Sequence, residues 1–299
     1  MATMDNRQLA YFVAVAEELS FTRAARRLFT VQSTVSAAIT ALETELGTKL
    51  FDRSTRRVAL SPDGALFLPE AKSALEAFER ARAVVQQTST GLRGSLRFGT
   101  LSSIGSLDLP AVLGAFHRKH PLVDIHVTVS VAGSTGLAAD VRQGRLDAAL
   151  VGLPSADLTG LRALPLENRP FVALLPSRHP MAAKRAVTLA DLMGERFIDT
   201  PRGFGNRVVT DRAYDDLGSP RRVVVEVADM RVIPRYVHSG LGVAIVPETD
   251  SPPVEDIAVR PLSPGLDWPL SFVTAAARPP SRAVRTLEDI LAAARSTPR

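Results

Sequence analysis

The sequence contains no cysteine among its 299 residues. This absence excludes disulfide frameworks, thiolate nucleophiles, zinc fingers and iron–sulfur clusters, and it fits a reducing cytoplasm. No run of 18 apolar residues is present, so no membrane span is expected. The opening segment MATMDNRQLAYF lacks the basic start and the apolar core of a signal peptide. We therefore expect a soluble, multidomain, cytoplasmic protein.

The sequence also lacks the patterns that mark common catalytic sites. Its histidines are scattered, and neither an HExxH nor a GxSxG motif occurs. Ser102 and Ser103 follow a predicted strand and precede a predicted helix, as a hydrolase nucleophile does, but no Gly-x-Ser-x-Gly frame surrounds them. The segments GFG at 203–205 and GLG at 240–242 lack the remaining spacing of a nucleotide-binding loop. We expect no catalytic residue, no metal and no cofactor.

What the sequence does contain is enough apolar material to fill cores. Hydrophobic residues make up 45% of the 299 residues, and this length predicts two or three domains. The net charge is +5, and the isoelectric point is about 10.0. This modest basic excess is compatible with a nucleic-acid partner or an anionic ligand, but it demonstrates neither.

The segment TVQSTVSAAITALETEL, residues 30–46, has the pattern of one amphipathic helix. Its apolar residues Val35, Ile39, Leu42 and Leu46 are spaced by four, three and four, which places them on one helical face. The opposite face is uncharged and mostly small, and neither Lys nor Arg occurs anywhere in the segment. A basic protein thus keeps one helix face free of positive charge.

A second helix is predicted just before this one, over residues 21–28, with Ser20 as its N-cap. We expect Thr30 to cap the helix that follows. Two helices joined by so short a turn form a helix-turn-helix candidate. Periodicity by itself favours a plain helical hairpin equally.

A short hairpin and a long helix are predicted next. Residues 58–60 form a strand after the charged turn at 53–57. From Pro62, with Ser61 as its cap, a helical pattern runs to about residue 87. The apolar seam of this helix has heptad spacing, interrupted by one arginine, so we expect a partner helix against it. The seam consists of Leu68, Ala71, Leu75, Phe78, Arg82 and Val85.

After residue 94 the pattern changes to alternating strands and helices, which predicts parallel sheets covered by helices, in two subdomains. The chain is expected to cross between the subdomains near residues 161–164 and to return near 268–274. The last helix, at 285–295, then covers the first subdomain. The expected strands are 95–99, 123–131, 146–151, 171–175, 197–200, 222–227 and 243–246, and the other expected helices are 109–119 and 137–143.

The wording of the N-terminal segments resembles one family closely. The matching stretches are SFTRAARRL at 20–28, QSTVS at 32–36, LETELGTKLFDR at 42–53 and TRRVALSPDG at 55–64. They resemble the LysR-type transcriptional regulators, far more specifically than a generic helix-turn-helix does. Later stretches continue the resemblance over essentially the whole chain: GRLDAAL at 144–150, LLPSRHP at 174–180 and GLGVAIVP at 240–247.

This resemblance implies the architecture. The chain is expected to have a winged helix-turn-helix at 1–61, a linker helix for dimerisation at 62–90, and an effector-binding domain at 91–299. That last domain is expected to have the α/β fold of periplasmic binding proteins, with subdomain I at about 91–162 and 268–299 and subdomain II at about 163–267. The implied function is a sequence-specific DNA-binding regulator controlled by an effector bound between the subdomains.

The resemblance also implies which residues meet DNA. The helix at 30–46 is expected to enter the major groove, with three arginines of the wing on phosphates. The implied DNA-binding residues are Gln32, Ser33, Thr34, Ser36, Ala37, Arg53, Arg56 and Arg57. For Arg26 and Arg27 a phosphate contact and a solvated helix face are equally supported. Gln can bond adenine at two points, and Ser or Thr can bond several base edges.

The chain departs from the family at the reading helix. The family often has Pro at the position of Ser33, and Arg and Gln at the positions of Ala37 and Ala38. The commonest contact to guanine, a two-pronged Arg, is therefore missing here. We expect less direct reading of bases and more reliance on DNA shape.

The effector is expected at loops that join strands to helices, because helix N-termini offer free N–H groups to an anion. For any single Ser or Thr there, ordinary N-capping is the favoured explanation. Arg202 can pair with an acidic ligand or can lie on the surface. The residues that the resemblance implies are Leu101, Ser102, Ser103, Ser134, Thr200, Arg202 and Phe204.

Three functions follow from these patterns. The first is the regulator, with double-stranded DNA, a small anionic effector, another copy of itself in a dimer or tetramer, and RNA polymerase as partners, and with no membrane. The second is a cytoplasmic solute-binding protein, because the C-terminal half has that two-lobed pattern. The third is an α/β enzyme with a helical appendage.

Overall fold

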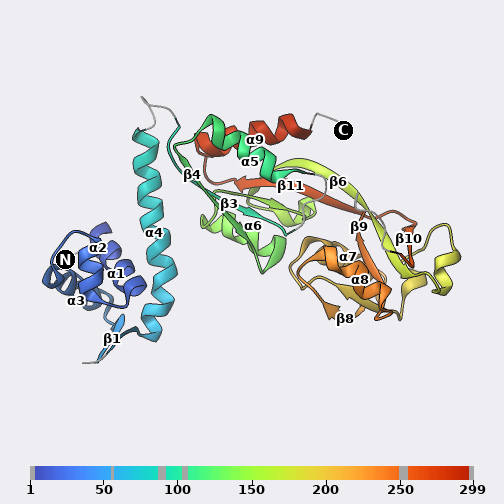
Figure 1. Ribbon diagram of the computed structural model, residues 1–299, viewed down its shortest axis with the longest axis horizontal. Coiled ribbons are helices and arrows are strands. Elements are labelled where there is room, and N and C mark those ends of the chain that lie inside the picture. Colours follow the sequence, from blue (N-terminus) through green and yellow to red (C-terminus); the bar gives the residue numbers. More distant parts are fainter. Residues whose placement is uncertain (1–3, 55–56, 87–91, 103–106, 249–254, 296–299) are drawn as a thin grey trace. The chain divides into compact units, whose positions relative to one another are not determined.

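The structure is a computed structural model that describes residues 4–54, 57–86, 92–102, 107–248 and 255–295 (Figure 1). The chain divides into two compact units, Met1–Thr90 and Gly91–Arg299. The first unit contains α1 Asn6–Glu18, α2 Phe21–Arg27, α3 Gln32–Leu46, the antiparallel hairpin of β1 Phe51–Ser54 and β2 Arg57–Leu60, and α4 Pro62–Gln86.

Side-chain caps determine where two of the first unit's helices begin. Asp5 accepts a hydrogen bond from the backbone N–H of Gln8 at 2.7 Å and starts α1. Ser20 caps α2, as the sequence predicted. For α3 the prediction was wrong, because the N-cap is Val31, which provides no side-chain hydrogen bond, and Thr30 lies one residue too early. The first N–H groups of α3 are therefore not covered by a side chain.

The core of the first unit forms around Phe12 of α1. Its ring lies 5.4 Å from the ring of Phe51 and 5.1 Å from that of Phe67, centre to centre. The predicted stripe of α3 is confirmed for three of its four residues, which are fully buried; the fourth, Leu46 at the helix end, is 38% exposed. These fully buried residues are Val35, Ile39 and Leu42.

The long helix α4 uses half of its apolar seam inside its own unit. Ala71 is buried in the first unit's core, and Leu68 and Leu75 pack against that core. The partner helix expected against the seam is therefore present for its first half, where α1 of the same unit packs against α4. Phe78, farther along α4, is 51% exposed, so this seam residue lies outside the core.

The second unit contains a seven-stranded sheet in the order β10-β6-β11-β5-β3-β4, with β9 also paired to β6, and a two-stranded sheet of β7 and β8. Its elements are β3 Gly94–Thr100, α5 Leu109–Lys119, β4 Val123–Val129, α6 Gly133–Gln143, β5 Ala148–Val151, β6 Leu161–Pro176, β7 Arg196–Asp199, α7 Gly205–Asp215, β8 Arg222–Glu226, α8 Ile233–His238, β9 Ala244–Pro247, β10 Ile257–Pro261, β11 Asp267–Ala275 and α9 Arg282–Arg295.

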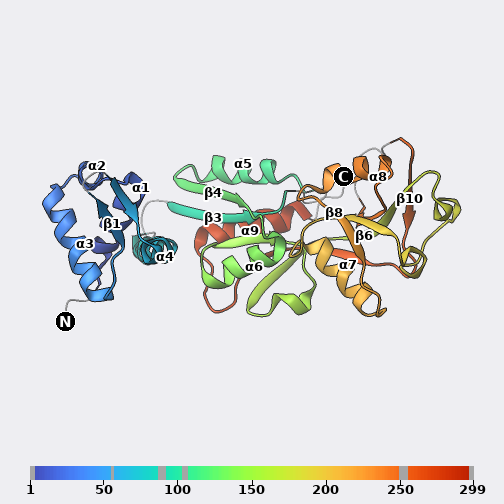
Figure 2. The same cartoon turned by 90° about the horizontal axis from the view of Figure 1, so that it is seen from below.

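Two long strands connect the halves of this unit. In Figures 1 and 2, β6 and β11 run from the half with α5, α6 and α9 to the half with α7 and α8. β3 pairs in parallel with β4 and β5, but β11 is antiparallel to β5 and β6. The expectation of parallel sheets was thus wrong for these two strands. They carry the chain across and back, so they must run in opposite directions.

Candidate DNA-binding and effector-binding sites

The outer face of α3 is built from short, uncharged side chains. Because its apolar residues point into the core, the helical period turns the remaining positions outward. Gln32, Ser33 and Ala37 are exposed, and Thr34 and Ser36 are half-buried. All of these predicted base-reading residues therefore lie on or beside one accessible helix face.

The arginines of α2 differ in what they contact. Arg23 and Arg27 are held by the end of α1: the Arg23 Nε lies 3.3 Å from a carboxylate oxygen of Glu18, and the Arg27 Nη1 lies 2.7 Å from one of Glu17. Arg26 is exposed and forms no ion pair with any described residue. Arg26 is thus the cation of α2 that is available to a phosphate.

The predicted wing residues are located by the hairpin. Arg53 in β1 pairs with Val58, and Arg57 in β2 pairs with Ser54, so both lie at the turn end of the two strands. Arg56 lies outside the described residues. The sequence predicted both arginines in the turn at 53–57, but they lie in the two strands that flank it.

Glu43 is a positioning residue that the sequence patterns did not single out. Its side chain is buried, and its Oε1 accepts the backbone N–H groups of Leu50 at 2.9 Å and Phe51 at 3.3 Å. Its Oε2 lies 3.3 Å from the ammonium of Lys49. The carboxylate thereby fixes the start of the wing hairpin to α3. The only signal in the sequence was its place beside Leu42 on the inward face.

In the second unit, the predicted effector loops come from both subdomains. The Oγ of Ser102, after β3, donates to the carbonyl of Ala228 at 3.1 Å, and Leu101 is half-buried. Ser103 lies outside the described residues. The backbone N–H of Thr135 donates to the carbonyl of Gly203 at 3.0 Å. These hydrogen bonds join segments that the sequence places far apart.

Close backbone contacts bring two of these loops together. A Cβ on Gly133 would lie 2.7 Å from the Cα of Phe204, and a Cβ on Gly205 would lie 1.8 Å from the carbonyl oxygen of Gly152. Gly133 also has a φ of +62°. Only glycine permits this approach, and Phe204 is buried as a result.

Two predicted hydroxyls are already used within the fold. The Oγ of Ser134 is buried and accepts the backbone N–H of Gly152 at 3.0 Å. The Oγ1 of Thr200 is buried and donates to the Oδ1 of Asn206 at 3.0 Å. Both side chains therefore shape the loops, and neither presents a free hydroxyl.

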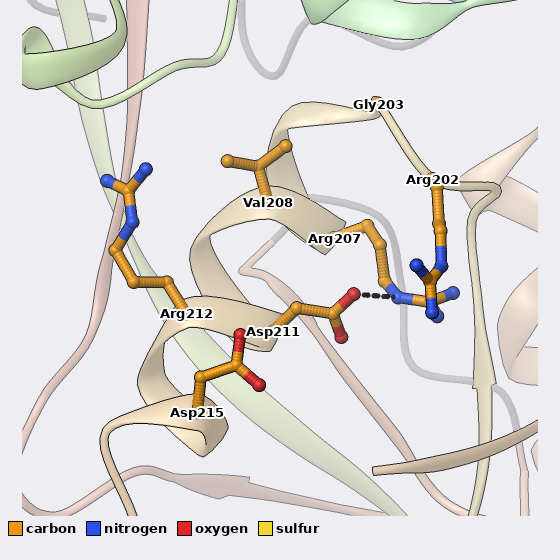
Figure 3. Close-up of a pocket in the computed structure, with 7 residues that line it drawn as sticks. All are labelled: Arg202, Gly203, Arg207, Val208, Asp211, Arg212 and Asp215. Carbon is orange, nitrogen blue, oxygen red and sulfur yellow. Dashed lines mark hydrogen bonds and ion pairs between the residues drawn. The ribbon is translucent and has the colours of Figure 1, made fainter. Parts of the chain in front are cut away.

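Arg202 lies at a surface hollow of about 310 Å³ beside α7 (Figure 3). Arg202 is exposed, whereas the side chain of Arg207 is only 6% exposed and donates to Asp211 at 2.6 Å. Burial works to lower the pKa of Arg207, but the hydrogen bond to Asp211 and the nearby carboxylates raise it. The hollow is lined by Arg202, Gly203, Arg207, Val208, Asp211, Arg212 and Asp215.

A buried network of charged and polar groups, centred on Asp199, contacts the start of α7. Asp199 accepts the N–H of Thr200 at 2.7 Å and the side-chain amide of Asn206 at 2.9 Å, and it lies 2.8 Å from the Nη2 of Arg221. Burial raises the pKa of Asp199 above its usual range. No sequence motif pointed to Arg221, since it comes from a loop far along the chain.

Aromatic rings complete this network. The guanidinium of Arg221 lies over the rings of Phe197 and Tyr214, at 5.1 and 5.5 Å from their centres. The hydroxyl of Tyr214 donates to the carbonyl of Leu189 at 3.0 Å, and burial raises its pKa to about 12. The base of the hollow is therefore rigidly built.

Within the ranges that the structure describes, no helix is long and apolar enough to cross a membrane. Nor do these residues include a group of three or more His, Asp or Glu arranged to hold a metal ion.

Comparison with known proteins connects both units to one family. The family model "Bacterial regulatory helix-turn-helix protein, lysR family" matches residues 6–65, and the model "LysR substrate binding domain" matches residues 89–296. A "Probable hydrogen peroxide-inducible genes activator" of Mycobacterium avium is 36% identical over 249 residues, 82% of this chain and 78% of the relative. The regulator ShiR of Corynebacterium glutamicum is 34% identical over 277 residues, 89% and 92% of the two chains.

Solved structures match over almost the whole length. Full-length OxyR C199D from Pseudomonas aeruginosa is 28% identical, with a TM-score of 0.66 over 97% of this chain and 95% of that one. Full-length BenM is 26% identical, with a TM-score of 0.56 over 97% and 96%. The chain therefore belongs to the LysR family of bacterial regulators: it is a DNA-binding transcriptional regulator with a C-terminal effector-binding domain, and neither an enzyme nor a solute-binding protein.

Proposed function

We propose that this regulator reads duplex DNA with the outer face of α3 and responds to a small anion held at the loops between its two C-terminal subdomains. The DNA-reading part rests on two observations: the outer face of α3 is accessible and uncharged, and Arg26 of α2 is exposed and forms no ion pair with any described residue. On this proposal base edges are read by Gln32, Ser33, Thr34, Ser36 and Ala37, and phosphates are held by Arg26, Arg53, Arg56 and Arg57.

The outer face of α3 offers few side chains that can form strong, base-specific hydrogen bonds. Gln32 is the one side chain on it that can bond adenine at two points, and the short hydroxyls and methyls can contact several bases each. Because residues 30–46 contain no Arg or Lys, strong contacts to guanine are missing. Phosphate contacts then supply most of the affinity, and the deformability of the site supplies much of the selectivity.

The proposed effector is a small anion, and Arg202 is the residue that supports this. Its guanidinium lies at the hollow beside α7, where Arg207 and Arg212 are already paired with carboxylates. The proposed effector-binding residues remain Leu101, Ser102, Ser103, Ser134, Thr200, Arg202 and Phe204. Among them Ser134 and Thr200 shape the loops, since their hydroxyls are used internally.

The signal is proposed to be a bound molecule and not an oxidised thiol. Two of the proteins compared above carry the names hydrogen peroxide-inducible genes activator and OxyR. This chain has no cysteine in its 299 residues, so it cannot form a disulfide or a sulfenic acid within them. Peroxide sensing by a cysteine among these 299 residues is therefore excluded, which favours non-covalent binding of an effector at the loops.

A two-state mechanism on the following division of the chain is part of the proposal. We propose a DNA-binding domain at 1–61, a dimerising linker helix at 62–90 and an effector-binding domain at 91–299, with subdomain I at about 91–162 and 268–299 and subdomain II at about 163–267. An effector that prefers one arrangement of the subdomains biases how the dimer or tetramer sits on DNA. RNA polymerase is proposed as a further partner, and the cytoplasm, where the DNA lies, as the location.

Footprinting on the intergenic region beside the protein's own gene tests the DNA-reading part. The expected result is a protected stretch at one position. Gln32→Ala should lower the discrimination between this site and unrelated duplexes, whereas Arg57→Ala should weaken binding to both and reduce its salt dependence. A folded protein that protects no stretch there would contradict regulation of the neighbouring genes.

A panel of small carboxylates and phosphates tests the effector part. A ligand selective for the native state raises the melting temperature of the full chain. Arg202→Ala should abolish the rise, whereas Arg235→Ala, which removes an exposed arginine of α8, should leave it unchanged. Equal responses of the two variants would show that the anion binds elsewhere.

A further inference from the structure

Phe29 occupies the turn between α2 and α3, and its side chain is 99% exposed. Its backbone φ is +52°, in the left-handed region that a bulky side chain rarely adopts. An exposed ring makes no packing contact that would offset this strained conformation. The free protein therefore gains nothing from a phenylalanine here, which points to a role in a complex.

The surroundings of Phe29 have a consistent chemistry. Val31, two residues later, is 63% exposed and leaves the start of α3 without a side-chain cap. Arg26, three residues earlier, is exposed and unpaired among the described residues. From residue 21 to residue 41 the chain has three arginines and no Asp or Glu. Along the chain, the apolar side chain of Phe29 thus lies between Arg26, which has no ion pair with a described residue, and the N–H groups at the start of α3, which the N-cap side chain does not cover.

We propose that Phe29 packs on the deoxyribose of the DNA backbone at the edge of the major groove, with Val31 beside it. This inference rests on the proposed reading of DNA by α3. A DNA strand alternates an anionic phosphate with a sugar whose C–H face is apolar. Arg26 and the first N–H groups of α3 suit the phosphate, and the exposed ring suits the neighbouring sugar. No acidic group in the segment opposes the polyanion.

This contact contributes affinity without sequence preference. Every nucleotide of duplex DNA presents the same sugar, so the ring distinguishes no base. The contact also releases no counterion, so it leaves the salt dependence of binding unchanged. These two properties separate the role of Phe29 from that of Gln32, which reads bases, and from that of Arg26, which holds a phosphate.

Asparagine is the informative replacement at this position. Asn tolerates positive φ, so Phe29→Asn relieves the backbone strain while it removes the ring. Phe29→Leu retains an apolar tip. Leu19, with a φ of +45° and 51% exposure in the same unit, gives the matched control Leu19→Asn, because it is the C-cap of α1 and belongs neither to α3 nor to the turn before it.

The full-length variants are titrated with a duplex that the wild-type protein enriches from a random pool, and with an unselected random duplex. If the deoxyribose covers about half of the Phe29 ring, the loss of this apolar contact in Phe29→Asn should weaken DNA binding about fivefold for each DNA-binding domain engaged. The loss should be the same for both duplexes, with an unchanged salt slope and an equal or higher melting temperature. Phe29→Leu should recover most of the affinity, and Leu19→Asn should bind as the wild type does.

Unchanged affinity of a folded Phe29→Asn would overturn the proposal. If that variant also failed to activate transcription, Phe29 would instead be assigned to a protein contact with RNA polymerase. A loss confined to the enriched duplex would overturn it as well, because the ring would then read bases. If the Arg26→Ala and Gln32→Ala variants also bind DNA as the wild type does, the proposed reading of DNA by α3 fails. If Phe29→Asn binds normally but Arg26→Ala and Gln32→Ala do not, only the role proposed for Phe29 fails.

Discussion

Arg212 of α7 joins Asp157 by two short hydrogen bonds, with its Nη2 lying 2.8 and 2.9 Å from the two carboxylate oxygens. Asp157 belongs to the 3-10 turn Ser155–Leu158 of subdomain I. Its backbone carbonyl also accepts a hydrogen bond from the Nη2 of Arg142 in α6, at 2.7 Å. The carboxylate raises the pKa of Arg212. This ion pair therefore connects the two subdomains at the edge of the hollow.

Breaking this ion pair should alter the subdomain equilibrium more than the overall stability. Both side chains are partly exposed, so Asp157→Asn should lower the free energy of unfolding by no more than about 1 kcal/mol. Hydrogen exchange should rise at the turn and along the exposed face of α7, because the arrangement that the pair favours loses population.

Arg145→Gln provides the control for the subdomain test. It removes an ion pair of similar exposure, Arg145 with Asp140 at 2.5 Å, which lies entirely within subdomain I. Similar exchange patterns in Asp157→Asn and Arg145→Gln would show that the connection between subdomains has no special effect.

Gly205→Ala should destabilise the effector-binding domain severely. The new Cβ would lie 1.8 Å from the carbonyl oxygen of Gly152, and neither backbone can yield without separating α7 from subdomain I. We expect a loss of about 3 kcal/mol or more in the free energy of unfolding. The emission of Trp268, the only tryptophan, reports this domain directly during denaturant titration.

Gly218→Ala separates steric clash from backbone strain. Gly218 has a φ of +67° but open space around its Cβ position, so only the strain applies, at about 1 kcal/mol. If both alanine variants lost the same stability, the contact between Gly205 and Gly152 would not be what holds the subdomains together.

Arg26 and Arg27 should behave differently in DNA binding although they are adjacent. Arg26→Ala should weaken binding to every duplex and reduce the salt slope by about one unit for each domain engaged, because one phosphate contact is lost. Arg27→Ala should leave the slope unchanged and weaken α1 instead, since Arg27 pairs with Glu17. Titrations at several salt concentrations decide this, and the reverse pattern would assign the phosphate to Arg27.

The pH dependence of the DNA-binding unit should include a contribution from Glu17. Hydrogen bonds from Lys72 of α4, at 2.7 Å, and from Arg27 lower the pKa of Glu17 below its ordinary value of 4.5. A lowered folded-state pKa means that the stabilisation is complete above 4.5 and is lost as the pH falls through the folded value.

Glu17→Gln should test that contribution. Because these ion pairs are exposed, the variant should lose only about 0.5 kcal/mol at neutral pH. The difference from the wild type should vanish in acid, as measured by hydrogen exchange of the α1 amides. A difference that persisted in acid would mean that Glu17 acts by packing and not by charge.

Local patterns predicted α3 well. The inward stripe of α3 depends on spacing within a few turns, and the cap at Ser20 depends on residues three apart, so both were visible before folding. The choice of cap for α3 was not, because Thr30 and Val31 are adjacent and the turn geometry around Phe29 decides which of them precedes the first helical residue.

The candidate effector site was less predictable from the sequence, because its hydrogen-bond partners are not set by local spacing. Ser134 and Thr200 have the composition of ligand-binding residues, yet Gly152 and Asn206 use their hydroxyls. Gly152 lies 18 residues after Ser134, and Asn206 lies six residues after Thr200. A periodic pattern in the sequence does not predict such contacts. Arg221 is the clearest case, since its position over Phe197 and beside Asp199 exists only after the strands have paired.

The sequence by itself determined the family, the helix-turn-helix and the uncharged face of α3, because these depend on residue types at short, regular spacings. Tertiary structure decided which arginine of α2 has no ion pair with a described residue, which half of the α4 seam is buried, that β6 and β11 run antiparallel, and which hydroxyls remain for a ligand. Each of these depends on which distant groups meet, since a charge or a hydroxyl is available only when no nearer partner satisfies it.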